Sequence, residues 1–148
     1  MNQIIDTAIF SGRMDPLHTG HILTLTRLLN RFSKIIVPVL DYENRVLDAT
    51  EVASYLIEIF EHNSKGRVIA IVNKIHFGKI TKYEYIKLLS SLNLRINETV
   101  YLSGNQSVID NFEKLGIRNE FVGRSGDFSG TEIRNNILDV KDYYSVFD

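Results

Sequence analysis

Two histidines near the amino terminus are the side chains in this chain best suited to phosphate chemistry. His18 and His21 are three residues apart, and a helix is expected to begin near Thr19, shortly after Pro16. The first N–H groups of a helix lack partners within it, and its dipole is positive there, so a helix start attracts anions. Two imidazoles on one face of this first turn can donate hydrogen bonds to phosphate oxygens.

The residues in front of the histidines fit the same chemistry. Gly12 follows a short apolar run and lets the backbone approach a ligand closely, and Arg13 offers a planar guanidinium for phosphate or carboxylate. A plain loop with two surface histidines is an equally open interpretation of these residues. A metal site is weaker, because no carboxylate or further histidine stands at a suitable spacing and a helix start disfavours a cation.

Two other segments carry polar groups in comparable places. Ser129 and Thr131 stand at a second expected helix start, and Arg134 lies three residues past Thr131. Gly104 and Asn105 follow an apolar run, and the asparagine amide can both donate and accept hydrogen bonds. Each segment alone also fits an ordinary helix cap or strand-to-helix turn.

The elements expected to position these segments alternate between strands and helices. We predict strands near residues 7–10, 35–40, 67–72, 98–102 and 120–122, and helices near 22–32, 48–60, 81–92, 108–115 and 129–138. This alternation is typical of a parallel sheet covered by helices on both faces. Ligands on such sheets bind beyond the carboxyl ends of the strands, so the three segments are expected to meet there. Pro38 argues against a fully hydrogen-bonded central position within its strand.

Length and composition exclude several classes of protein. The 148 residues fit one domain, residues 1–148, and the lack of cysteine removes disulfide frameworks, thiolate nucleophiles and cysteine-based metal sites. A net charge of -1 disfavours a nucleic-acid partner. Without an apolar run of about 20 residues or a signal-peptide pattern, we expect no membrane association and a cytoplasmic location.

Two of these segments resemble the signatures of the HxGH nucleotidyltransferases. Residues 12–21, Gly-Arg-Met-Asp-Pro-Leu-His-Thr-Gly-His, resemble the first signature, and residues 129–134, Ser-Gly-Thr-Glu-Ile-Arg, resemble the second. The resemblance covers nearly the whole chain. It implies an α/β fold, a Rossmann-like doubly wound five-stranded parallel sheet of order 3-2-1-4-5 with helices on both faces.

The resemblance also implies roles for individual residues. The catalytic side chains would be Arg13, His18, His21 and Arg134. The nucleotide-binding residues would be Gly12, Gly20, Gly104, Asn105, Arg124, Ser129, Gly130 and Thr131. No side chain is expected to bind a metal directly, and Mg²⁺ would be bound through the nucleotide phosphates. The family transfers a nucleoside monophosphate from ATP or another NTP to a phosphate-bearing small molecule, and its members range from dimers to hexamers, which leaves a homo-oligomer open.

Within this family the chain looks most like the archaeal-type nicotinamide mononucleotide adenylyltransferases. Arg13 and the pattern of the carboxyl-terminal half carry that likeness, whereas Met14, Asp15 and Val52 depart from it. Relatives usually have an arginine that handles phosphate where this chain has Val52, and Arg45 is a candidate to replace it. Two alternatives stay open: a cytidylyl- or adenylyltransferase acting on a polyol-, sugar- or pantetheine-phosphate, and a nucleotide-binding module without turnover.

Overall fold

The fold is a five-stranded sheet in which all strands are parallel. The computed structural model describes residues 5–123, apart from the side chains at positions 62 and 63, so the predicted helix at 129–138 lies outside the described residues. The strands are β1 (Thr7–Phe10), β2 (Lys34–Leu40), β3 (Val68–Asn73), β4 (Thr99–Ser103) and β5 (Asn119–Phe121). Their spatial order, β3-β2-β1-β4-β5, confirms the predicted fold class and topology.

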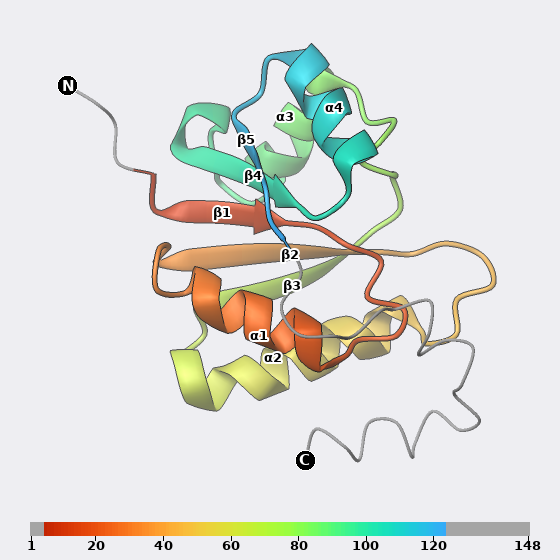
Figure 1. Ribbon diagram of the computed structural model, residues 1–148, viewed down its shortest axis with the longest axis vertical. Helices are drawn as coiled ribbons and strands as arrows, with labels where there is room; N and C mark the ends of the chain where they lie inside the picture. The colour runs from red at the N-terminus through yellow and green to blue at the C-terminus, as the bar shows by residue number, and fades with distance from the viewer. Residues whose placement is uncertain (1–4, 124–148) are drawn as a thin grey trace.

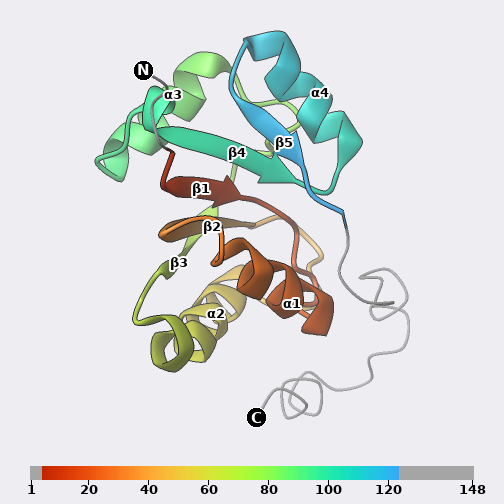
Figure 2. The same ribbon diagram turned by 60° about the vertical axis from the view of Figure 1, so that its left-hand side comes forward.

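Helices cover both faces of the sheet. They are α1 (Thr19–Leu28), α2 (Ala49–Ser64), α3 (Lys82–Ser91) and α4 (Gln106–Leu115), with a short 3₁₀ turn, η1 (Ile96–Glu98), before β4. The α1 and α2 helices lie on one face, and α3 and α4 lie on the other (Figures 1 and 2). Within residues 5–123, no helix has the length and apolar character needed to cross a bilayer.

Alternating side chains of the strands supply two separate apolar cores. Ala8 and Phe10 of β1 pack in the core beneath α1 and α2, whereas Ile9 belongs to the core beneath α3 and α4. The same alternation places Leu102 in the first core and Tyr101 in the second. Successive strand residues point to opposite faces, so a sheet covered on both sides needs the continuous apolar runs that the sequence shows.

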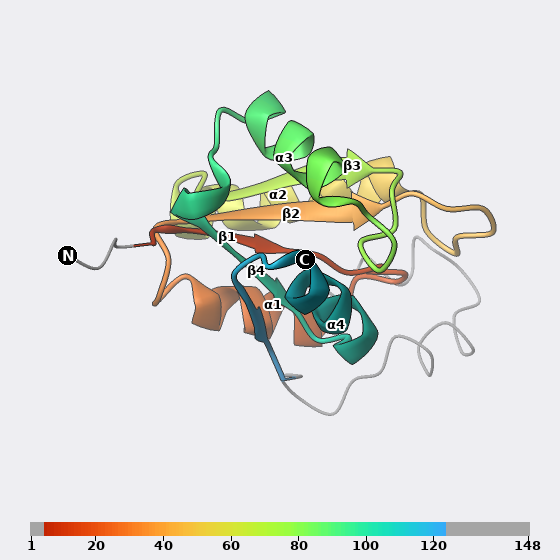
Figure 3. The ribbon, with the colours of Figure 1, turned by 90° about the horizontal axis from the view of Figure 1, so that it is seen from above.

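The strand order changes direction at β1, and this position creates an opening at the carboxyl edge. The chain leaves β1 toward α1 on one face, while it leaves β4 toward α4 on the other (Figure 2), and Figure 3 looks onto the face that carries α3 and α4. Two neighbouring strands whose connections diverge in this way leave a crevice between them, where ligands of such sheets bind.

The surroundings of Pro38 show how this opening begins. The β2 strand is interior, so the prediction from Pro38 holds only locally. Pairing between β1 and β2 runs to Ile9 and Ile36 and resumes only at the bridge between Gly12 and Val39. Ile35 donates its N–H toward β3, and residues alternate sides along a strand, so Pro38 faces the β1 side. Its missing N–H therefore falls where the ladder is already interrupted.

Val52 has a structural role that its sequence position does not indicate. Its side chain is fully buried in the core beneath α1 and α2. An arginine at position 52 would point into that core. The lack of an arginine here therefore gives no information about how this protein handles phosphate.

We predict that Val52→Arg lowers the free energy of unfolding by about 3 kcal/mol or more, because it buries an unpaired charge. Ser54→Arg, on the exposed side of the same helix, is the matched control and should change stability by about 0.5 kcal/mol or less. Urea unfolding followed by circular dichroism measures both. A Val52→Arg protein as stable as the wild type would contradict this placement.

Candidate functional site

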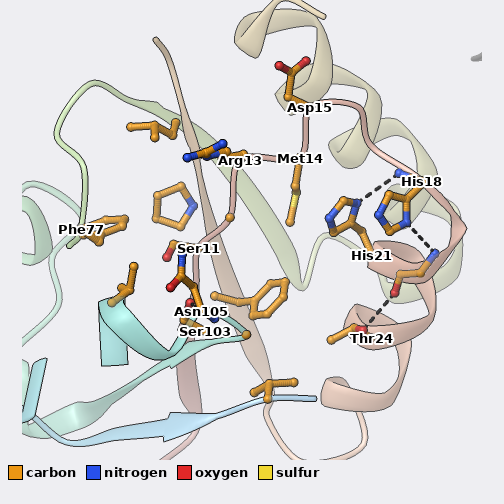
Figure 4. Close-up of a pocket in the computed structure, with 18 of the residues that line it drawn as sticks. Ser11, Arg13, Met14, Asp15, His18, His21, Thr24, Phe77, Ser103 and Asn105 are labelled. Carbon is orange, nitrogen blue, oxygen red and sulfur yellow. Dashed lines mark hydrogen bonds between the residues drawn. The ribbon is translucent and has the colours of Figure 1, made fainter. Parts of the chain in front are cut away.

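A pocket of about 260 Å³ lies at the carboxyl edge of the sheet, where the strand order changes direction (Figure 4). All the predicted site residues within residues 5–123 line it: Gly12, Arg13, His18, Gly20, His21, Gly104 and Asn105. The other predicted site residues, Arg124, Ser129, Gly130, Thr131 and Arg134, lie outside the described residues. Segments nearly 90 positions apart in sequence therefore meet at one pocket.

His18 and His21 form a stacked pair at the start of α1. Their ring centroids are 3.8 Å apart with an interplanar angle of 27°. His18 is the N-cap residue, and its Nδ1 accepts a hydrogen bond from the Gly20 N–H at 3.1 Å. The Nδ1 of His21 accepts from the His18 N–H, also at 3.1 Å. The two rings thus act as a reciprocal helix cap.

These hydrogen bonds determine which nitrogen of each ring carries the proton. A neutral imidazole has one donor and one acceptor nitrogen, and Nδ1 is the acceptor in both His18 and His21. Each neutral ring therefore carries its proton on Nε2. Because both rings line the pocket beside the positive end of a helix, these N–H groups suit an anionic ligand.

One expectation for this helix start needs correction. We expected the free N–H groups of the first turn to bind the anion, but Gly20 donates to the His18 ring and His21 donates to the His18 carbonyl oxygen. Those two amides are already satisfied. Besides the remaining amide of this turn, the groups at the start of α1 that line the pocket are the imidazoles of His18 and His21.

The backbone of the loop after β1 is held by Arg45. Its guanidinium donates to the carbonyl oxygens of Arg13 at 2.7 Å, Met14 at 3.0 Å, Leu40 at 2.5 Å and Leu47 at 2.6 Å. Met14 is buried with a φ of 47°, a left-handed conformation that costs a residue with a Cβ about 1 kcal/mol. Arg45 therefore has a structural role, and the suggestion that it replaces a phosphate-binding arginine is wrong.

Asp15, in the loop after β1, accepts hydrogen bonds from the loop after β2. Its carboxylate is buried and accepts hydrogen bonds from the Tyr42 hydroxyl at 2.6 Å, the Leu47 N–H at 2.8 Å and the Val46 N–H at 3.0 Å. The residue that departs from the family pattern here thus ties the loop after β1 to the loop after β2. Asp15 also lines the pocket, so the same side chain holds the two loops together at the edge of the site.

The turn after β4 combines structural and ligand-facing groups. A Cβ at Gly104 would lie 3.0 Å from the Val122 carbonyl oxygen, a tight contact that favours glycine here. The Oδ1 of Asn105 accepts from the Ser107 N–H at 3.0 Å and caps α4. The Asn105 amide NH₂ makes no hydrogen bond within the described part of the chain, and it lines the pocket.

Sequence reasoning missed the contribution of the loop after β3. His76 and Phe77 line the pocket together with Val108 of α4. The His76 Nδ1 accepts from the Gly78 N–H at 2.9 Å, which again leaves Nε2 as the protonated nitrogen of the neutral ring. Phe77 is buried against Tyr101 and other rings of the second core. Applying the strand-end rule to the third strand would have pointed to this loop.

A pair of hydrogen-bonded hydroxyls lies at the inner end of the pocket. Ser11 lines the pocket, and its Oγ is hydrogen-bonded to the Tyr101 hydroxyl beneath it. Burial raises the pKa of Tyr101 far above its ordinary value, so the phenol stays neutral. Between residues 5 and 123, no three histidine or carboxylate side chains gather as a metal site would require.

The comparisons with known proteins fit this geometry. No protein-family model matches the chain. The phosphopantetheine adenylyltransferase of Francisella tularensis subsp. novicida (strain U112) is 26% identical, over 72% of this chain and 75% of that enzyme.

Solved structures share the fold at lower identity. A bifunctional NMN adenylyltransferase/ADP ribose pyrophosphatase from Francisella tularensis has a TM-score of 0.63 at 18% identity, and a structure of it also contains AMP and a manganese ion. The NadR protein in complex with NAD and AMP-PNP has a TM-score of 0.60 at 18% identity, over 89% of this chain and 42% of that one. This chain is matched over 94% of its length but spans only 44% of the bifunctional protein. The chain thus shares its fold with these solved structures, and the phosphopantetheine adenylyltransferase is similar to it in sequence.

We predict that His18 serves the helix and the ligand through different nitrogens. In His18→Asn the amide oxygen can still cap α1, whereas His18→Ala removes the cap and should be about 1 kcal/mol less stable than the asparagine variant. Both variants lose the Nε2 donor and should bind ATP about tenfold or more weakly. Urea unfolding and calorimetric titration measure the two effects. Equal stability of the two variants would rule out the capping role.

We predict that Asp15→Ala costs about 3 kcal/mol of stability, because two backbone N–H groups and the Tyr42 hydroxyl lose their acceptor. Asp110→Ala, at an exposed aspartate of α4, is the control and should cost little. Thermal unfolding compares the two proteins. A loss no larger than that of the control would show that the link between the loops is not stabilising.

Proposed function

We propose that this protein transfers AMP from ATP to a phosphate-bearing small molecule and releases pyrophosphate, with nicotinamide mononucleotide as the preferred acceptor. The observation that carries the proposal is the stacked pair of His18 and His21, whose Nε2 groups stand at a helix start in the crevice where the strand order changes. The 26% identity to a phosphopantetheine adenylyltransferase and the shared fold support adenylyl transfer in general.

The chemistry requires positioning and charge stabilisation more than covalent participation by the protein. A phosphate oxygen of the acceptor attacks the α-phosphorus of ATP, forming a new P–O bond. The bond from the α-phosphorus to the bridging oxygen breaks, and its electron pair leaves with pyrophosphate. Donors that are already oriented stabilise the charge that develops on the transferring phosphoryl group. In the proposed reaction, His18 and His21 supply such donors, with His21 nearest the α-phosphate.

The remaining pocket residues have separate proposed roles. Arg13 binds phosphate at the rim of the pocket, and Gly12 and Gly20 leave room for the substrates. The Asn105 amide and the neighbouring Gly104 border the nucleotide, and the His76 Nε2 donates to a ligand from the side opposite α1.

We also propose that Ser129, Thr131 and Arg134 bind the β- and γ-phosphates, with Arg124 and Gly130 beside them. The course of the described chain supports this. Glu120 pairs with Arg31, in the turn after α1, at 2.8 Å, and the Gly123 carbonyl accepts from Arg27 of α1 at 3.5 Å, one helical turn nearer the histidines. Val122 and Gly123, the two described residues after β5, thus lie beside α1 and line the pocket.

A divalent ion fits this proposal as a partner of the nucleotide. In the proposed reaction, Mg²⁺ would be bound mainly through the phosphates, where it neutralises the charge of the leaving pyrophosphate. A cytoplasmic location, a homo-oligomer and a single domain over residues 1–148 remain predictions.

A second candidate acceptor is phosphopantetheine, because the sequence relative that we compared acts on it by name. The module without turnover is now less well motivated. Val52 was the departure that suggested it, and Val52 is a core residue outside the pocket.

The deciding experiment incubates the protein with Mg²⁺ and either ATP or CTP, together with one acceptor at a time. Nicotinamide mononucleotide, phosphopantetheine and glycerol phosphate are compared by pyrophosphate release and by chromatography of the product. We expect NAD from ATP and nicotinamide mononucleotide, and a loss of about 100-fold or more in His21→Ala. Transfer to another acceptor without any NAD would reject the pyridine nucleotide, and no pyrophosphate from any pair would reject the transferase.

A further inference from the structure

Tyr42 stands behind Arg13 and does not itself line the pocket. The Arg13 guanidinium lies 5.7 Å from the centroid of the Tyr42 ring, and Arg13 lines the pocket whereas Tyr42 does not. The Arg13 side chain is exposed and makes no hydrogen bond to any residue in the described part of the chain. Its five N–H donors therefore remain for a ligand.

The Tyr42 ring is itself fixed from two directions. Its hydroxyl donates to the buried Asp15 carboxylate at 2.6 Å, and the Arg45 guanidinium lies 5.3 Å from the ring centroid. Burial, together with the hydrogen bond to Asp15, raises the pKa of the Tyr42 phenol, so it remains a protonated donor at neutral pH.

The two arginines that approach this ring have different functions. Arg45 donates to four carbonyl oxygens, including those of Arg13 and Met14, so its donors are committed to the fold. Arg13 has its backbone held by Arg45 and its guanidinium placed against the face of Tyr42. Of the two arginines at this ring, only Arg13 lines the pocket.

We propose that Tyr42 is a positioning residue for Arg13, and that Arg13 held against its ring binds a substrate phosphate. This deepens the proposed function and depends on it for the identity of the substrates. An arginine side chain that is ordered before the ligand arrives loses less conformational entropy on binding. The phosphate belongs either to the nucleotide or to the acceptor, and separate titrations distinguish the two.

The test is a double-mutant cycle with Tyr42→Leu, Arg13→Ala and the variant that carries both changes. ATP and nicotinamide mononucleotide are titrated separately by calorimetry. For the ligand whose phosphate is bound, we expect Arg13→Ala to weaken binding about tenfold and Tyr42→Leu about two- to fivefold, as for a cation–π contact near the surface. The double variant should bind no more weakly than Arg13→Ala alone.

Two controls separate positioning from a general loss of structure. Tyr42→Phe keeps the ring but loses the bond to Asp15, so it should retain affinity within about twofold while losing stability. Tyr83→Leu makes the same change at an exposed tyrosine of α3 and should bind both ligands like the wild type. If Tyr42→Leu does not fold, Tyr42→Met removes the ring with a more adaptable side chain and repeats the cycle.

The inference is overturned if the effects of Tyr42→Leu and Arg13→Ala add independently, if Tyr42→Phe binds as weakly as Tyr42→Leu, or if the wild type binds neither ligand. Turnover is measured in parallel. Coupled effects on binding without pyrophosphate release would leave the positioning role in place and reject the transferase. Turnover together with independent effects of Tyr42→Leu and Arg13→Ala would support the transferase and reject the positioning role.

Discussion

Reciprocal hydrogen bonds between two loops hold the pocket in shape. Asp15 in the loop after β1 accepts from two backbone N–H groups of the loop after β2 and from Tyr42. Arg45 in the second loop donates to carbonyl oxygens of Arg13 and Met14 in the first. Each charged side chain therefore satisfies backbone groups of the opposite loop. Because buried polar groups without partners are costly, the two loops hold one another in a single arrangement, including the left-handed backbone at Met14.

In the histidine pair, each ring has a structural role through one nitrogen and a proposed ligand-binding role through the other. The Nδ1 atoms of His18 and His21 cap α1, and this leaves the protons on the opposite nitrogens. A cap of aspartate or serine would satisfy the helix equally well but would not offer a ligand an oriented imidazole N–H. In the proposed function, stability and ligand binding are thus linked at His18, and substitutions must be chosen to separate them.

The fold alone does not select a substrate. Proteins with NMN adenylyltransferase and phosphopantetheine adenylyltransferase names both resemble this chain, the first in structure and the second in sequence. The sheet supplies the crevice and the helix start, which suit any nucleoside triphosphate. In the proposed reaction, discrimination between acceptors would come from pocket side chains such as Arg13, with Tyr42 behind it, and His76 and Phe77.

Local patterns in the sequence were sufficient for the elements, the parallel sheet and the helix start near Thr19, because strand alternation, helix periodicity and capping depend on residues a few positions apart. The strand order and the site residues of the first signature followed from resemblance to a family. Only the tertiary structure could show that Asp15 and Arg45 hold the loops after β1 and β2 together, that Val52 is buried in the core, and that His76 lines the pocket. These roles depend on partners about 30 or more positions away, brought near by the crossing of parallel strands, and no short-range pattern encodes such contacts.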